Sequence, residues 1–250
     1  MKIAILQCDS VLDELVEEFG DYPDMVRSML QGLAGNLSFQ VFDVTRQEYP
    51  DDPDAFDCYI STGSRAAAYA QTPWIERLIR FVRLLDERRK KLVGICFGHQ
   101  IIALACGGEV SKSEKGWGIG VSVNRIVCRP TWMCEPRERL NIIVSHQDQI
   151  TKLPPSATVI AESDFCPYFI IQWNDHFLSI QGHPEWHRAY SRALIERRRE
   201  IIDPARIEKG LASLALQPDS ALFARWIFAF ATGVSPENHG GGSATPDLIP

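Results

Sequence analysis

The chain has 250 residues, of which 45% are hydrophobic, enough for one large core or a core with a small appendage. Its formal net charge of −6 argues against nucleic acid as the main partner, because nucleic-acid-binding proteins carry basic surfaces. No apolar run approaches the ~20 residues that cross a bilayer, so no membrane partner is expected. The seven cysteines have no regular spacing, which argues against a disulfide framework or a metal site and favours a reducing cytoplasm.

Strands and helices alternate over the first hundred residues. Residues 1–9 turn polar too early for a signal peptide and contain a first strand, Ile3–Leu6. The other elements expected here are strands over Phe39–Val44, Asp57–Ser61 and Lys91–Ile95, and helices over Pro23–Leu33, Pro73–Leu85 and Ile101–Ala105. This alternation predicts a parallel sheet with helices on both faces, whose ligands bind at the carboxyl ends of the strands.

The pattern changes after Gly107-Gly108. Five short strand-like runs with few helices between them predict antiparallel or mixed pairing: Gly118–Val127, Asn141–Val144, Thr158–Ala161, Phe169–Trp173 and Phe177–Gln181. Three helices are then expected, over Ala189–Ile202, Pro204–Leu216 and Ser220–Thr232. The apolar stripe Leu222 to Phe230 predicts core or interface packing, and the run Arg197-Arg198-Arg199 predicts a solvated helix face.

The stretch Gly94-Ile95-Cys96-Phe97-Gly98 places one cysteine on a sharp strand-to-helix turn, the geometry of a nucleophile elbow. Glycine on both sides lets neighbouring backbone approach closely. A thiol at a helix N-terminus is favoured as the thiolate, which is the attacking species. On its own this frame leaves two interpretations open, a reactive nucleophile or a small buried side chain. The second is expected for Cys8, Cys58, Cys106, Cys128, Cys134 and Cys166.

A histidine and a glutamate follow a later apolar strand, in the stretch Gln181-Gly182-His183-Pro184-Glu185-Trp186. Side chains two residues apart in an extended segment emerge on the same side, so His183 and Glu185 are expected to face the same way. A histidine oriented by a carboxylate is the base that a thiol nucleophile needs. An isolated His-x-Glu is more often a solvated surface pair, but its occurrence together with the cysteine elbow favours the catalytic interpretation.

The chain resembles the class I glutamine amidotransferases in three separated motifs: Gly94–Gln100, Ser145–Asp148 and Gln181–Glu185. The resemblance covers about residues 1–190. It implies an α/β fold of the flavodoxin-like kind, with an open, mostly parallel sheet flanked by helices and a C-terminal helical extension. We therefore expect a catalytic domain over residues 1–190, a helical extension packed on it over 191–235, and a flexible tail over 236–250.

The resemblance also implies a role for each matching residue. Cys96 would attack a γ-glutamyl amide and form a thioester, and His183 and Glu185 would complete the triad. The backbone N–H groups of Phe97 and Gly63 would form the oxyanion hole, in which a donor contributes ~3–4 kcal/mol to the transition state. Three residues would bind the glutamyl head: Gln100, Ser145 and His146.

Other residues near these motifs receive weaker assignments. Trp117 is expected to border the glutamyl pocket, although an aromatic residue between two glycines is as often a packed turn. His99 is expected to point away from Cys96. The histidines without a partner pattern in the sequence, and therefore without an expected chemical role, are His176, His187 and His239.

The loop Ser61-Thr62-Gly63-Ser64 keeps only the glycine of the Gly-Gly-Pro-like loop in many family members, and is more similar to the branch that includes γ-glutamyl peptidases. Two hydrolytic functions stay open. One releases ammonia from glutamine for a separate synthetase subunit, and the other cuts γ-glutamyl peptides or conjugates with water as acceptor. A non-catalytic binding protein is the third alternative, disfavoured because Cys96, His183 and Glu185 are all present. A small-molecule substrate is expected without a cofactor, because no glycine-rich phosphate loop with a lysine occurs.

Overall fold

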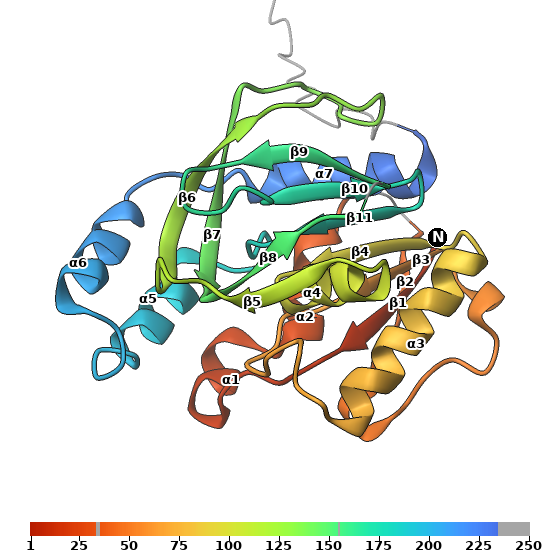
Figure 1. The fold of residues 1–250 in the computed structure, drawn as a ribbon, viewed down its shortest axis with the longest axis horizontal. Coiled ribbons are helices and arrows are strands. Elements are labelled where there is room, and N and C mark those ends of the chain that lie inside the picture. The colour runs from red at the N-terminus through yellow and green to blue at the C-terminus, as the bar shows by residue number, and fades with distance from the viewer. Residues whose placement is uncertain (34–35, 155, 235–250) are drawn as a thin grey trace, which may run out of the picture.

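A nine-stranded sheet in the order β2-β1-β3-β4-β11-β10-β9-β6-β7 forms the centre of the molecule (Figure 1). The computed structural model describes residues 1–33, 36–154 and 156–234, so the predicted tail over 236–250 lies outside the described residues. The parallel strands are β1 (Lys2–Gln7), β2 (Ser38–Asp43), β3 (Cys58–Ser61), β4 (Lys91–Ile95) and β11 (Phe177–Ile180). The antiparallel strands are β6 (Gly118–Ile126), β7 (Arg139–His146), β9 (Ala157–Glu162) and β10 (Ile170–Trp173). The expected open α/β sheet, with its change of pairing after the first hundred residues, is confirmed.

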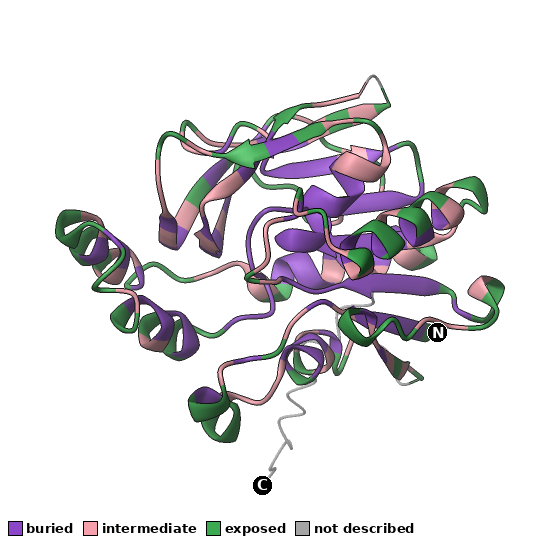
Figure 2. Cartoon of the chain, turned by 60° about the horizontal axis from the view of Figure 1, so that its bottom comes forward, coloured by how far each residue is buried: buried purple, intermediate pink, exposed green. Residues whose placement is uncertain are grey.

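Helices pack on both faces of the sheet. One core joins the strands to α2 (Tyr22–Leu30) and α7 (Ser220–Thr232), and a second core joins them to α3 (Pro73–Glu87) and α4 (Phe97–Ala105). Phe223, Trp226 and Phe230 of α7 are buried in the first core, as the apolar stripe predicts. Figure 2 shows buried strands between helices whose outer surfaces are exposed.

A third apolar cluster joins the end of the sheet to the helices near β6 and β7. It contains side chains of α1 (Asp13–Phe19), α5 (Arg188–Glu196) and α6 (Pro204–Ser213) together with Val121 and Ile143. The chain leaves helix α5 at Glu196, earlier than the predicted end at Ile202, and residues 197–201 form turns. Arg198 therefore lies on a turn, where its direction does not follow the face of the helix.

Several short elements were not expected from the sequence. They are α1, the two-stranded sheet of β5 (Glu109–Lys112) and β8 (Asp148–Lys152), and the 3-10 turns Val44–Arg46 and Pro53–Ala55. Helix α1 has seven residues, only one of them buried, so it lacks a periodic apolar face. Strands β5 and β8 are partly exposed and too short to produce a clear alternation.

The strand register brings the ends of three strands together, β3, β4 and β11. Strand β4 pairs with β11 so that Ile95 lies opposite Ile180, and Gly94 lies opposite both Ser61 and Ser179. The backbone N–H of Cys96 donates to the carbonyl of Ile180 at 2.8 Å. The elbow after β4, the loop after β3 and the segment after β11 therefore meet at one edge of the sheet, where parallel sheets bind their ligands.

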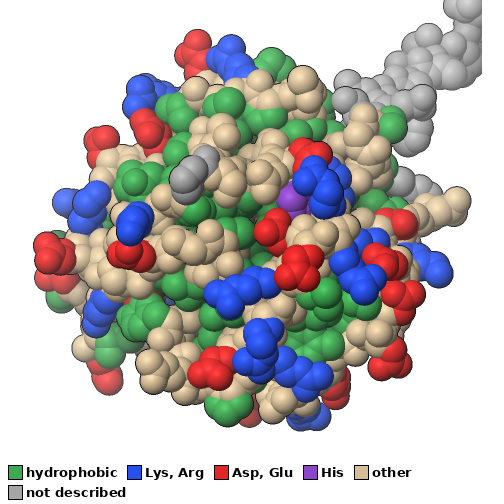
Figure 3. Space-filling view, turned by 45° about the vertical axis from the view of Figure 1, so that its right-hand side comes forward, with side chains coloured by type: hydrophobic (Ala, Val, Ile, Leu, Met, Phe, Trp, Pro, Cys, Tyr) green, Lys and Arg blue, Asp and Glu red, His purple; other side chains and the backbone are tan. Residues whose placement is uncertain are grey.

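The surface carries charges of both signs. Figure 3 shows acidic and basic side chains interspersed on one face, without a large region of a single sign. Over residues 1–33, 36–154 and 156–234, no helix is long and apolar enough to span a bilayer. In the same ranges no group of three or more His, Cys, Asp and Glu side chains is placed to hold a metal ion.

Candidate active site

Cys96 lies on the elbow between β4 and α4 in a conformation rare for a residue with a side chain. Its φ is 51° and its ψ is −93°, and its side chain is only 6% exposed. A Cβ at Gly94 would lie 2.7 Å from the backbone of Gly98, and a Cβ at Gly98 would lie 2.7 Å from Ser61 Oγ. The two glycines thus allow helix α4 to approach the strands closely enough to form the elbow.

His183 and Glu185 form a buried hydrogen-bonded pair behind the elbow. The distance between His183 Nδ1 and Glu185 Oε1 is 2.7 Å, and both residues are 3% exposed. The backbone N–H of His183 is fixed by the Ile143 carbonyl at 2.7 Å, and the indole of Trp186 stacks on the imidazole with ring centroids 3.6 Å apart. The predicted same-side arrangement of the two side chains is present, and the imidazole is held on several sides.

The electrostatics of this pair favour a protonated histidine. Burial lowers the pKa of His183, but the charge of Glu185, the charge of a thiolate at Cys96 and hydrogen bonds to both outweigh burial and raise the pKa to about 9. Because Nδ1 faces the carboxylate, Nε2 is the ring nitrogen that remains for Cys96 or a substrate. This arrangement places a protonated imidazole, a proton donor, beside the thiol.

The two predicted oxyanion-hole residues flank this pair. Phe97 is the first residue of α4. The first N–H groups of this helix donate no hydrogen bond to a capping side chain at Cys96. Gly63 follows β3 and packs directly against the imidazole of His183. Both residues are therefore close to Cys96 or His183, while their role in binding an oxyanion stays a prediction.

Replacement of Gly63 by alanine is expected to lower kcat by ~10–100-fold. The added Cβ would lie 2.7 Å from His183 Cε1, so the imidazole must move away from its present position. Steady-state kinetics would measure the loss, and the unfolding temperature would show whether the fold survives. Retention of wild-type kcat would mean that the position of His183 relative to this loop is not important.

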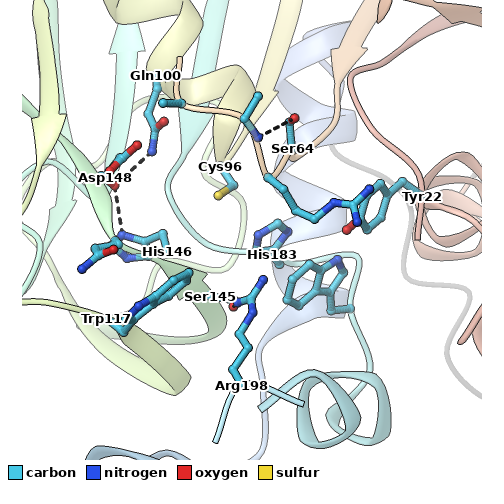
Figure 4. A pocket seen from close by; sticks show the side chains of 15 residues that line it. Tyr22, Ser64, Cys96, Gln100, Trp117, Ser145, His146, Asp148, His183 and Arg198 are labelled. Carbon is cyan, nitrogen blue, oxygen red and sulfur yellow. Dashed lines mark hydrogen bonds between the residues drawn. The ribbon is translucent and has the colours of Figure 1, made fainter. Parts of the chain in front are cut away.

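A cavity of about 220 Å³ opens beside Cys96, and Figure 4 shows the side chains that line it. All three residues predicted to bind the glutamyl head line this cavity: Gln100, Ser145 and His146. Gln100 Nε2 donates to the carbonyl of Asp148 at 3.0 Å and to Gln181 Oε1 at 3.2 Å. Trp117 also lines the cavity, as expected.

His146 is a neutral side chain in this cavity. Burial, together with the nearby charge of His183, lowers the pKa of His146 to about 4, although a hydrogen bond to the Asp148 backbone opposes the shift. The neutral ring donates from Nδ1 to the carbonyl of Asp148 at 3.2 Å, so Nε2 is an acceptor. Within the described residues Nε2 has no hydrogen-bond partner. His146 can therefore accept a hydrogen bond from a bound ligand.

Gln181 and Trp186 are two of the residues at or near the cavity that were not identified from the sequence as parts of the site. Gln181 is fully buried and donates from Nε2 to Cys96 Sγ at 3.5 Å, which links Gln100 to the thiol. Trp186 lines the cavity and covers one face of the catalytic candidate His183. Both follow strand β11 next to predicted residues, so their position in the motif was the signal that could have found them.

One expectation about charged residues was wrong. Arg198, in the run predicted to be a solvated helix face, turns into the cavity, and its Nη1 donates to the hydroxyl of Ser145. Its neighbour Arg197 does pair with Glu14 at the surface. His176, which has no partner pattern in the sequence, lies 2.7 Å from Asp86 and 3.1 Å from Asp175. Ser145 and Asp86 come from distant parts of the chain, so sequence spacing does not show their contacts with Arg198 and His176.

The remaining expectations concern histidines and cysteines, of which His239 lies outside the described residues. His99 is fully buried with Nδ1 2.8 Å from Ser179 Oγ, and it is not among the residues that line the cavity. Burial, with the charge of His146, lowers its pKa to about 3. Of the six cysteines expected to be small buried side chains, three are buried (Cys8, Cys58 and Cys166) and three are only half-buried (Cys106, Cys128 and Cys134).

Comparison with known proteins identifies relatives over most of the chain. The sequence model of the family Glutamine amidotransferase class-I matches residues 43–198. The chain is 32% identical to gamma-glutamyl peptidase 2 of Arabidopsis thaliana, over 88% of this chain and 91% of that protein. It is 34% identical to a glutamine amidotransferase-like protein of Schizosaccharomyces pombe, over 74% and 79% of the two chains. The crystal structure of a glutamine amido transferase from Methylobacillus flagellatus has a TM-score of 0.71 and 20% identity, and covers 96% of this chain and 97% of that one.

Proposed function

The chain belongs to the class I glutamine amidotransferase family, and we propose that it hydrolyses the amide bond of a γ-glutamyl compound through a thioester on Cys96. The observation that carries this proposal is the buried His183–Glu185 pair, with its 2.7 Å hydrogen bond, next to a thiol on a strained elbow at the same cavity. A cysteine that only filled the core would need neither a strained backbone conformation nor a base with an orienting carboxylate beside it.

The reaction begins with the thiolate of Cys96 and the imidazolium of His183. The sulfur attacks the γ-carbonyl carbon, a carbon–sulfur bond forms, and the carbonyl oxygen becomes an oxyanion. When the oxyanion collapses, the carbon–nitrogen bond breaks and the leaving nitrogen takes the proton from His183 Nε2. Water then gives a proton to His183 while its oxygen attacks the thioester. The carbon–sulfur bond then breaks, which regenerates the thiolate of Cys96, and the product leaves as glutamate after its new γ-carboxyl group gives its proton to solvent.

The other residues of the site assist these steps by position and charge. Glu185 holds the tautomer of His183 and stabilises the imidazolium. The N–H groups of Phe97 and Gly63 are proposed to bind the oxyanion. The side chain of Gln181 donates to the resting thiolate and keeps it in place, because its Nε2 lies 3.5 Å from Cys96 Sγ. No step requires a cofactor.

We propose a γ-glutamyl peptide or conjugate, rather than free glutamine, as the substrate, with water as acceptor. The support is the similarity to gamma-glutamyl peptidase 2, which extends over nearly the whole of both chains. Release of ammonia from glutamine to a separate synthetase subunit is the second candidate. It is supported by the similarity to a protein named as glutamine amidotransferase-like, and it needs a partner protein.

A panel of substrates distinguishes the two candidates. The purified protein alone is expected to cleave γ-glutamyl dipeptides with a kcat/KM at least ~10-fold above that for glutamine. Release of glutamate would be measured for each compound. Turnover of glutamine that rises only when a co-purified partner is added, with dipeptides left intact, would support the ammonia-delivering function instead.

A further inference from the structure

The cavity contains two arginines that differ in their partners. Arg65 forms a bidentate salt bridge with Asp9, in which Nε donates to Oδ2 at 2.9 Å and Nη2 donates to Oδ1 at 2.7 Å. Arg198 makes no ion pair with a carboxylate within the described parts of the chain. Its contacts there are the hydroxyl of Ser145, which accepts a hydrogen bond, and the ring of Trp117, whose centroid lies 4.7 Å from Cζ.

These contacts hold the Arg198 guanidinium in one position, but neither partner is an anion that would neutralise its charge. Burial lowers the pKa of Arg198 from its ordinary value, because the side chain has lost part of its water. A desolvated cation without a counter-ion is stabilised strongly by an anion, and the planar guanidinium matches a carboxylate through two parallel hydrogen bonds. The side chain is thus a prearranged site for a carboxylate at the cavity wall.

The surroundings of Arg198 place it on the side of the leaving group. His183 must deliver its proton to the leaving nitrogen, so the leaving amine lies on the His183 side of Cys96. Trp186 stacks on His183, and Tyr22 stacks on Trp186 with centroids 6.4 Å apart. Arg198 lines the same cavity as Tyr22 and Cys96, and in Figure 4 its guanidinium points toward His183.

The glutamyl head has a different set of partners across the cavity. Gln100, His146 and Asp148 lie together on the other side of Cys96 (Figure 4). Asp148 carries the one carboxylate among the described cavity-lining residues, so it suits the α-ammonium group of the substrate. The α-carboxylate is bonded to the same carbon and stays with that group. A carboxylate that reaches Arg198 therefore comes from the other half of the substrate.

We propose that Arg198 binds a carboxylate carried by the leaving amine, so that the substrates are γ-glutamyl amino acids and short γ-glutamyl peptides rather than uncharged γ-glutamyl amines. This inference rests on the proposed function, because it assigns the substrate class of the same cavity. It also explains why Ser145 and Trp117 hold a cation beside the nucleophile. Arg198 acts here as a specificity residue that contacts the substrate and takes no part in proton transfer.

The test compares γ-glutamylalanine with γ-glutamylethylamide, which differ by one carboxylate on the leaving amine. Arg198→Met is expected to lower kcat/KM for γ-glutamylalanine by roughly 10–100-fold and to leave γ-glutamylethylamide nearly unchanged. Arg198→Lys should restore part of the loss. Arg197→Met removes the adjacent arginine, which pairs with Glu14 at the surface. It is the matched control and should leave kcat/KM unchanged for both substrates.

Equal losses on both substrates would overturn the proposal, since Arg198 would then bind the glutamyl α-carboxylate or only support the fold. No loss on either substrate would overturn it as well. Binding measured calorimetrically in Cys96→Ala keeps the test independent of turnover: γ-glutamylalanine should bind more weakly when Arg198→Met is added, and γ-glutamylethylamide should not. A wild-type protein that cleaves neither compound would contradict the proposed hydrolysis, while this binding comparison would still decide the role of Arg198.

Discussion

Replacement of Cys96 by alanine is expected to abolish hydrolysis, with kcat at least ~10⁴-fold below wild type, and to abolish the covalent intermediate. The sulfur of Cys96 is the only protein atom that forms a covalent bond with the substrate in the proposed mechanism. Without it, the other residues of the site can still bind the substrate and stabilise an oxyanion, but no thioester forms. Intact-protein mass spectrometry after rapid acid quenching should detect a γ-glutamyl adduct in the wild type and none in Cys96→Ala.

Cys106 provides a matched control at the opposite end of the same helix, since Cys96 precedes α4 and Cys106 follows it. Burial raises the pKa of the Cys106 thiol to about 12, so it is not a nucleophile at neutral pH. Cys106→Ala should keep wild-type turnover and the adduct. If the adduct persists in Cys96→Ala and disappears in another cysteine variant, that other cysteine is the nucleophile and the proposal for Cys96 is wrong.

The elbow also predicts an effect on stability. Cys96 has a φ of 51°, which glycine adopts without steric cost. Cys96→Gly should therefore be more stable than Cys96→Ala by ~1 kcal/mol or more, although both are inactive. Chemical denaturation would measure the difference. Greater stability of the alanine variant would show that the conformation of Cys96 is not strained.

The second large effect is expected for Glu185→Gln, which should lower kcat by ~10²–10⁴-fold. The glutamine retains the shape of the side chain but removes the charge that raises the pKa of His183 to about 9. In the wild type, kcat/KM should fall as pH rises through about 9, when His183 loses the proton needed by the leaving nitrogen. In Glu185→Gln this limb should move to lower pH.

The same pKa shift affects stability. The pKa of His183 is about 9 in the folded protein and about 6.5 in the unfolded chain. Its contribution to the free energy of unfolding is therefore fully present below a pH of about 6.5, and it disappears as the pH rises through about 9. The stability advantage of the wild type over Glu185→Gln should shrink over that range. Asp86→Asn is the control, because it removes a carboxylate from another histidine, His176, outside the described cavity lining. An unchanged pH profile in Glu185→Gln would contradict the proposed role of Glu185.

Much of the fold and of the candidate site followed from local patterns. The elbow around Cys96 and the His183–Glu185 pair could be predicted because each depends on neighbouring residues within one short segment. The order of the strands is less local, but alternation of strands and helices restricts it strongly. The five parallel strands then bring the two motifs to the same edge.

The features that escaped prediction depend on contacts between distant segments. Arg198 follows the end of helix α5, and its direction is set by Ser145 and Trp117, which belong to other elements. His176 lies between Asp86 and Asp175, of which only the second is close in sequence. Neither contact leaves a periodic signal. A run of three arginines is usually solvated, and here tertiary packing selects one of the three for the cavity.

The pairing of β4 with β11 has a consequence for the time at which activity arises during synthesis. The strand that carries the nucleophile is complete by Ile95, whereas its neighbour begins at Phe177, and the carbonyl of Ile180 accepts the backbone N–H of Cys96. Contacts this distant in sequence form late in folding, because a long loop must close first. A ribosome-bound chain that has just exposed the elbow therefore has neither base nor cavity around its cysteine. The reactive thiol arises only after the chain has been translated beyond Glu185 and this part of it has folded.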